Sequence, residues 1–184
     1  MDSKLSTKRT TMLVLRAQAG DRDAADRLLE TIQGELFGYL LKMLNDRADA
    51  EDVLQASLLQ AVKKLKWLRE PEHFRAWIFR IASRQGFRII KRRQKRVEFS
   101  NVEFLDAVAP AEITEPEHQD LIQRIPEWLE RLTPNGREAL MLHYLMGFTT
   151  AQVADILGIP LGTAKSRISY SLACIRKHVT NFGG

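Results

Sequence analysis

Apolar residues recur along the chain at steps of three and four, the spacing of helices, and no convincing alternating strand pattern occurs. In the N-terminal half the spacing predicts helices at about 23–44, 49–65 and 73–95. A short break at 69–72, containing Pro71, separates the last two. The first helix would bury Leu28, Leu29, Ile32, Leu36, Tyr39, Leu40 and Met43. The second would bury one apolar face formed by Leu54, Leu58, Ala61, Val62 and Leu65.

The C-terminal part of the chain holds several short helical segments, each with residues that begin or end helices. A threonine-proline pair at 133–134 is typical of an N-cap followed by a first-turn proline. The run TTAQ at 149–152 fits a capping box. Gly147 and Gly158 stand where C-terminal caps are expected.

A short helix at 151–157, a Gly-Ile-Pro connection and a longer helix at 160–178 form the pattern of a helix-turn-helix. The longer helix has an apolar face, expected to be buried, made of Ala164, Ile168, Leu172, Ile175 and Val179. Its opposite face carries donors able to reach base edges or phosphates, namely Thr163, Lys165, Ser166, Arg167, Ser169, Tyr170, Arg176 and Lys177. A purely structural hairpin is the alternative. Cys174 lies between the two faces and is interpreted as a packing residue.

Between the two halves, residues 97–123 hold seven carboxylates, two prolines and no Lys or Arg. This composition is typical of a linker, with a helix resuming near its end. The sequence therefore predicts an all-α protein with two small helical domains, 1–96 and 120–184. The acidic linker, 97–119, joins them, and the C-terminal domain contains the helix-turn-helix.

Positive charge is concentrated in one stretch. The formal net charge is +5 and the pI is about 9.5, a balance that favours an acidic partner such as nucleic acid. Between residues 63 and 96 there are thirteen Lys or Arg and only two acids. On the predicted third helix, every fourth position is basic, at Arg80, Arg84, Arg88 and Arg92. The stripe predicts phosphate contacts, and a merely solvated face is the alternative.

Aromatic residues lie among these basic residues. Trp67 and Phe74 bracket the predicted break, where a ring could stack on an unpaired base for about 1–3 kcal/mol. Trp77 is expected in the core. For Trp67 the sequence leaves stacking and plain packing equally open.

The sequence offers little for catalysis. Its four histidines, at 73, 118, 143 and 178, lack ligand spacing with one another or with the single cysteine, Cys174. Neither a glycine-rich phosphate loop nor a nucleophile motif occurs. We therefore expect no enzyme activity, no metal and no cofactor. No segment approaches the roughly 18 apolar residues of a membrane span, and a lone cysteine fits a reducing compartment. A cytoplasmic protein without membrane insertion is expected.

Two blocks of sequence resemble a known family. The segments DRADAEDVLQ (46–55) and FRAWIFRIA (74–82), followed by arginines, are similar to the promoter-melting domain of the extracytoplasmic-function (group IV) sigma factors of bacterial RNA polymerase. The segment LERLTPNGREALMLHYLMGFTTAQVADILGIPLGTAKSRI (129–168) resembles their second DNA-binding domain. The resemblance implies a transcription initiation factor that binds core RNA polymerase, through the β′ clamp and β subunits, and promoter DNA, at elements named −10 and −35. An anti-sigma factor is a usual further partner.

The resemblance also implies residue roles. Docking on the β′ clamp would use Asp49, Glu51, Asp52 and Gln55, although acids at a helix N-terminus also stabilise its dipole. Contact with the −10 element would use Lys66, Trp67, Arg69, Phe74, Arg80, Arg84, Arg88 and Arg92. Contact with the −35 element would use Arg137, Thr149, Thr163, Lys165, Ser166, Arg167, Ser169, Tyr170 and Arg176. The chain departs from the family's usual residues at Ala56, Leu58, Arg84, Arg88, Tyr170 and Leu172.

Two other interpretations compete with the initiator. A sigma-like mimic that sequesters an anti-sigma factor without initiating transcription would share both domains, but the acidic cluster and the donor-rich helix favour the initiator. A stand-alone helix-turn-helix regulator would leave the basic helix and the first domain unexplained.

Overall fold

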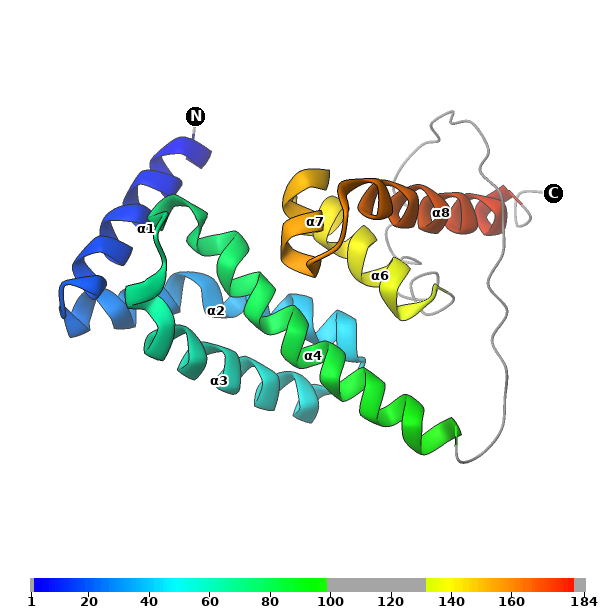
Figure 1. Ribbon diagram of the computed structural model, residues 1–184, viewed down its shortest axis with the longest axis horizontal. Coiled ribbons are helices and arrows are strands. Elements are labelled where there is room, and N and C mark those ends of the chain that lie inside the picture. The colour runs from blue at the N-terminus through cyan, green and yellow to red at the C-terminus, as the bar shows by residue number, and fades with distance from the viewer. Residues whose placement is uncertain (1, 99–131, 181–184) are drawn as a thin grey trace. The chain divides into compact units, whose positions relative to one another are not determined.

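Helical periodicity in the sequence is matched by helices in space (Figure 1). The structure, a computed structural model, describes residues 2–98 and 132–180. The chain divides into two compact units, Met1–Arg92 and Arg93–Gly184, and the division falls inside the long helix α4. Within the described residues every regular element is helical. The predicted all-α class is therefore confirmed, whereas most of the predicted linker, and the helix expected near its end, lie outside the described residues.

The N-terminal unit contains four helices and two short 3₁₀ turns between the third and fourth. In chain order they are α1 (Asp2–Gln18), α2 (Arg22–Leu44), α3 (Arg47–Lys64), η1 (Leu65–Trp67), η2 (Pro71–His73) and α4 (Phe74–Glu98). Helices α2, α3 and α4 agree with the predicted ones to within three residues, and Pro71 begins η2 inside the predicted break.

Short polar turns set the sharp reversals of this unit. Asn45 adopts a left-handed conformation, with φ 49°, and ends α2. The next residue, Asp46, accepts a hydrogen bond from the Asp49 amide at 2.9 Å and caps the start of α3. Because only two residues join the helices, α3 folds back along α2, and the two pack together.

The core of the N-terminal unit lies between α2, α3 and α4. The predicted inward residues of α2 are buried, except that Leu29 is half-buried. The Tyr39 ring lies 5.2 Å from that of Phe79, measured between centroids, and joins α2 to α4. The largest fully buried side chains here are Leu28, Leu36, Tyr39, Leu40, Phe74, Ile78 and Phe79.

The predicted buried face of the second helix is confirmed at Ala61 and Leu65, which are buried, and is wrong at Leu54, Leu58 and Val62. The buried side chains of α3 are Ala50, Val53, Ser57 and Ala61. Leu54 and Leu58 are only half-buried, and Val62 is 49% exposed. Alanine and serine at the buried positions leave room for α3 to approach α2 closely, so the larger residues beside them remain at the edge of the interface.

Helix α1 was not predicted from the sequence. Its stretch Met12–Leu15 is apolar, but Met12 and Leu15 are exposed and only Val14 is fully buried. A helix with so little apolar surface depends on its tertiary contacts. Those contacts are with α2 and with both 3₁₀ turns, η1 and η2.

The C-terminal unit has the predicted helix-turn-helix. Its described elements are α6 (Pro134–Leu140), a turn of π-helix η3 (Met141–Leu145), α7 (Thr150–Leu157) and α8 (Leu161–Thr180). Thr133 caps α6, and the capping box between Thr149 and Gln152 is present at α7. Gly147 and Gly158 have φ of 68° and 67°, which confirms them as turn glycines.

The core of this unit is formed between α6, η3, α7 and α8, where α8 packs on both α6 and α7. On α8, Ala164 and Ile168 are buried as predicted, while Leu172 and Ile175 are half-buried. Ser171, which the apolar pattern did not indicate, is buried against α6. The C-terminal half of α8 therefore turns a small polar residue toward α6 where the prediction expected Leu172.

Candidate nucleic-acid interface

The basic residues of α4 lie opposite its core face. Ile78, Phe79 and Ala82 are fully buried, while Arg84 and Arg88 are exposed. Because a helix turns about 100° per residue, the arginines at 84, 88 and 92 lie on one side. Among the described residues, none of the ion pairs involves Arg84, Arg88 or Arg92. The result is an exposed, positively charged ridge.

Arg80 differs from the other three arginines of this series. Its side chain is half-buried, and its Nε is buried without a hydrogen-bond partner among the described residues. A guanidinium in this setting presents only its outer part to a ligand. Arg80 therefore begins the ridge at the edge of the core, and Arg84, Arg88 and Arg92 continue it in solvent.

The turn between α3 and α4 exposes two neighbouring residues, Lys66 and Trp67. Trp67 is 66% exposed, the most exposed large hydrophobic side chain of the described residues. The Lys66 Nζ lies 5.1 Å from the centroid of the Trp67 ring, in cation–π contact. Leu65 and Leu68 on either side are buried. Of the two alternatives left open by the sequence, core packing is excluded for Trp67 in this conformation, and its ring is accessible for stacking.

Phe74 was expected to be a second stacking residue, and the structure contradicts this. Its side chain is 1% exposed, and its ring centroid lies 6.1 Å from that of Trp77. Phe74 begins α4 and fills the core there, so its ring cannot reach a base without leaving the core. Arg69, also expected at this site, is exposed on the connection between the two turns.

The second candidate surface is the outer face of α8. Lys165, Ser169 and Tyr170 are exposed, with 46% of Tyr170 accessible. Half-buried residues flank them, namely Thr163, Ser166, Arg167 and Arg176. The Ser166 hydroxyl donates to the Thr163 carbonyl at 3.0 Å within the helix. This face is rich in donors, as the sequence indicated.

Two further residues predicted to contact DNA lie outside α8. Thr149 is exposed, and its hydroxyl accepts a hydrogen bond from the Gln152 amide at 3.2 Å as part of the capping box. Arg137 of α6 is half-buried, and its Nε is enclosed by the protein. Thr149 therefore has an established structural role, and any DNA contact would be additional.

The acidic cluster at the start of α3 faces solvent. Glu51, Asp52 and Gln55 are exposed, and Asp49 is half-buried in the first turn. Glu51 accepts a hydrogen bond from Arg47 Nε at 2.8 Å, one helical turn away. The N-cap of α3 is Asp46, which was not among the residues predicted from the sequence. An aspartate placed just before the start of a helical pattern is the sequence feature that indicates such a cap.

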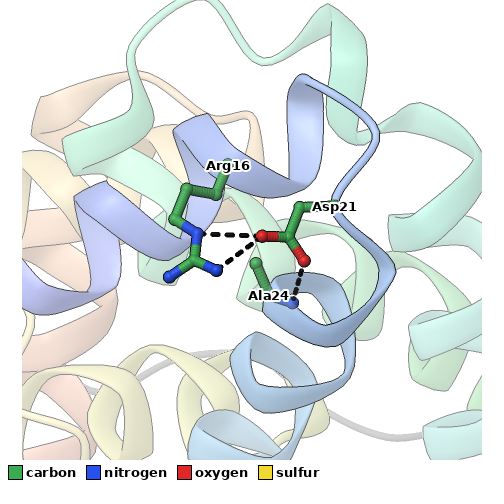
Figure 2. A network of polar contacts seen from close by, with 3 residues as sticks. All are labelled: Arg16, Asp21 and Ala24. Carbon is green, nitrogen blue, oxygen red and sulfur yellow. Dashed lines mark hydrogen bonds and ion pairs between the residues drawn. The ribbon is translucent and has the colours of Figure 1, made fainter.

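A polar cluster at the junction of α1 and α2, shown in Figure 2, was not predicted from the sequence. Asp21 accepts from the Ala24 amide at 3.0 Å and thereby caps α2. It also accepts from Arg16, at 2.9 Å from Nε and 2.6 Å from the terminal nitrogen. The Ala24 amide and then the Arg16 guanidinium lower the pKa of Asp21 below its ordinary value of 3.8. In the sequence, an aspartate directly after Gly20 is the feature that indicates a helix start at this point.

Within the described residues, no group of three or more His, Cys, Asp or Glu is placed to hold a metal ion. No helix in the same ranges is both long and apolar enough to cross a membrane.

Comparison with known proteins identifies the two units. The family model described as Sigma-70 region 2 matches residues 28–96, and the one described as Sigma-70, region 4 matches residues 122–175. The chain is 33% identical to the ECF RNA polymerase sigma factor SigL of Mycobacterium tuberculosis, over 80% of this chain and 84% of SigL. It is 28% identical to the RNA polymerase sigma-H factor of Pseudomonas aeruginosa, over 94% of this chain and 95% of that protein.

A solved structure has the same fold. The sigma factor RpoE of Bartonella quintana, determined in complex with the anti-sigma factor NepR, matches with a TM-score of 0.65 and 25% identity, over 84% of this chain and 96% of RpoE. Regions 2 and 4 together define a sigma-70-type protein, and this chain belongs to its extracytoplasmic-function group. It is accordingly a promoter-directing transcription initiation factor, whose partners are core RNA polymerase and promoter DNA.

Proposed function

We propose that the two exposed surfaces divide promoter recognition between them. The N-terminal domain, 1–96, binds core polymerase and recognises and melts the −10 element. The C-terminal domain, 120–184, reads the −35 element through its helix-turn-helix. The acidic segment 97–119 links them. The observation that carries this proposal is the exposed Trp67 beside Lys66, in the same unit as the arginine ridge of α4.

At the −10 element, a single strand would lie along the ridge with one base stacked on Trp67. Exposed cations supply sequence-independent affinity for the phosphates, and an accessible aromatic ring supplies stacking that requires an unpaired base. The contacting set is Lys66, Trp67, Arg69, Arg80, Arg84, Arg88 and Arg92. Phe74 is left out because it is buried.

At the −35 element, α8 would enter the major groove with Lys165, Ser169 and Tyr170 toward the bases. Ser166 and Thr163 lie beside them on the same helix, while Arg137, Thr149, Arg167 and Arg176 would hold phosphates. A recognition helix of this kind reads bases through its exposed donors and is oriented by backbone contacts around them.

Core polymerase would be held on the exposed start of α3, at Asp49, Glu51, Asp52 and Gln55, which we assign to the β′ clamp. The β subunit would contribute further contacts. The solved relative RpoE is bound to an anti-sigma factor, and we propose that this chain also has an anti-sigma partner. Its site of action would be the cytoplasm, with polymerisation performed by the partner enzyme and no catalysis, metal or cofactor in this chain.

Run-off transcription tests the proposal. The protein is added to sigma-free core polymerase with fragmented DNA of its own genome, and the transcripts are sequenced. We expect discrete start sites that share two upstream motifs, and loss of these transcripts with Trp67→Ala or with Lys165→Ala. A chain that binds an anti-sigma factor but neither binds nor redirects core polymerase would be a mimic, and the proposal would be wrong.

A further inference from the structure

The turn that carries Lys66 and Trp67 is held at both ends by one side chain from another part of the sequence. The side-chain amide of Gln18 donates to the Leu65 carbonyl at 2.9 Å and to the Leu68 carbonyl at 2.8 Å. The Leu68 amide also donates to the Leu65 carbonyl, at 3.0 Å, and closes the turn. Lys66 and Trp67 are therefore the two central residues of a turn whose flanking carbonyls meet at one amide group.

These two hydrogen bonds use the full donor capacity of Gln18, because a glutamine amide has two N–H groups. They also give the Leu65 carbonyl a second donor beside the Leu68 amide, and they give the Leu68 carbonyl a donor from another helix. The bonds are partly buried, and Leu65 and Leu68 are themselves buried. Water would compete poorly with them, so they restrict the turn more than exposed bonds would.

Gln18 is itself held in place by the end of α1. The Asp21 amide donates to the Arg16 carbonyl at 3.1 Å, and the Gly20 amide donates to the Ala17 carbonyl at 3.0 Å. With Gly20 at φ 97°, this is a Schellman ending, which requires a residue that tolerates the left-handed region. The ion pair between Arg16 and Asp21 spans the same junction (Figure 2).

From these contacts we infer that Gln18 is a positioning residue for promoter melting: it fixes the Lys66–Trp67 turn so that the Trp67 ring is presented to an unpaired base. The inference rests on the proposed role of Trp67 at the −10 element. Gln18 precedes the segment matched by the region 2 family model, 28–96. Gln18 itself touches no base. It restricts the turn before DNA binds, so that less conformational entropy is lost when the Trp67 ring stacks on a base.

The test is a double-mutant cycle in holoenzyme assembled from core polymerase and the full chain. Gln18→Met keeps the length of the side chain and removes both donors. The variants are Q18M, W67A and the double variant, with Gln33→Met, an exposed glutamine of α2, as the matched control. The probe is the single-stranded −10 segment of a promoter found by run-off transcription. It carries 2-aminopurine, whose fluorescence falls on stacking, at each position in turn.

We expect Q18M to weaken binding of this probe roughly five- to tenfold, the cost of ordering one or two extra side chains. The 2-aminopurine quenching at the stacked position should decrease in parallel. In the W67A background the same substitution should change affinity less than about twofold, because its effect passes through Trp67. Q33M should bind like the unchanged protein.

Other outcomes overturn the inference in distinguishable ways. If W67A weakens binding and Q18M does not, the role of Gln18 is wrong while the proposed stacking on Trp67 stands. Equal losses from Q18M with and without Trp67 would indicate a general effect on the fold. If W67A itself has no effect, the assignment of the turn to the −10 element fails, and the inference fails with it. Should Q18M not fold, Gln18→Asn, which keeps the donors but shortens their reach, replaces it with the same expected direction.

Discussion

The hydroxyls of Tyr39 and Ser83 lie 2.7 Å apart in the core of the N-terminal unit and join α2 to α4 by a hydrogen bond. Both side chains are almost completely buried, at 0% and 3% exposed. Ser83 immediately precedes Arg84, so this bond helps to fix the rotation of α4 about its axis. The rotation decides which side of α4 carries the exposed arginines.

Tyr39→Phe should lower the free energy of unfolding by about 1–2 kcal/mol, because it removes one buried hydrogen bond and keeps the ring. Urea unfolding followed by circular dichroism measures this. The double variant with Ser83→Ala should cost less than the sum of the two single changes, since both remove the same bond. Additive losses would show that the two hydroxyls do not depend on each other.

Substitution of Ser57, on α3, is expected to change the free energy of unfolding in the opposite direction from Tyr39→Phe. Its hydroxyl is fully buried and has no hydrogen-bond partner among the described residues. Ser57→Ala should raise the free energy of unfolding by roughly 1 kcal/mol, because it removes an unsatisfied polar group and favours the helix. The same urea titration applies, with Ser83→Ala as the contrasting change. A loss of stability would mean that the Ser57 hydroxyl has a partner in solution.

In the C-terminal unit, Gly136 of α6 faces Ser171 of α8 at close range. A Cβ added at Gly136 would overlap the Ser171 hydroxyl oxygen. Gly136→Ala should therefore cost about 1–3 kcal/mol of stability by overpacking. Ser171→Ala removes the overlapping atom and leaves its Cβ at 3.7 Å, an ordinary contact. We expect the double variant to unfold at a higher temperature than Gly136→Ala alone, and failure of this rescue would contradict the close approach.

The Arg16–Asp21 pair predicts a pH dependence of stability. The pKa of the Asp21 carboxyl is lowered in the folded protein, first by the Ala24 amide and then by Arg16. Its contribution to stability is therefore present at pH values above the unfolded pKa, about 4 for an aspartate. It is lost as the pH falls through the folded value.

Asp21→Asn keeps an oxygen that can cap α2 and removes the charge. We expect it to be less stable than the unchanged protein at pH 7, with the difference shrinking to zero at the acidic end of a titration from pH 7 to pH 2. Asp26→Asn, at an exposed position of the same helix, is the control. If the two proteins still differ in stability at low pH, the negative charge of Asp21 is not the source of its contribution.

Arg84→Gln and Arg88→Gln test the ridge on α4. A single-strand phosphate contact contributes about 0.7 to the slope of log affinity against log salt. Each substitution should therefore make the salt dependence of binding to single-stranded −10 DNA shallower by about that amount. The measurement is fluorescence anisotropy of holoenzyme at several salt concentrations. Arg27→Gln, at an exposed position of α2, should leave the slope unchanged, and a ridge whose variants behave like this control does not contact phosphate.

The sequence by itself determined the features that depend on local chemistry. Helical spacing, the capping box at Thr149 and the glycine turn at Gly158 were all predicted and are all present. These signals are readable because each is satisfied within one or two helical turns, through a side chain that bonds a nearby amide or a glycine that tolerates positive φ. The same periodicity also predicted the donor-rich face of α8, because this face lies opposite the apolar residues of the helix.

Only the tertiary structure decided matters that depend on residues far apart. On α3 the sequence predicted one buried face centred on Leu54 and Leu58, whereas the packed helix buries Ala50, Val53 and Ser57 beside the predicted Ala61. Trp67 and Phe74 looked alike in sequence, yet one is exposed and the other is in the core. Gln18 bonds carbonyls 47 and 50 residues away. No local pattern encodes such a contact, because which side chain reaches which carbonyl depends on how α1 packs against the turns.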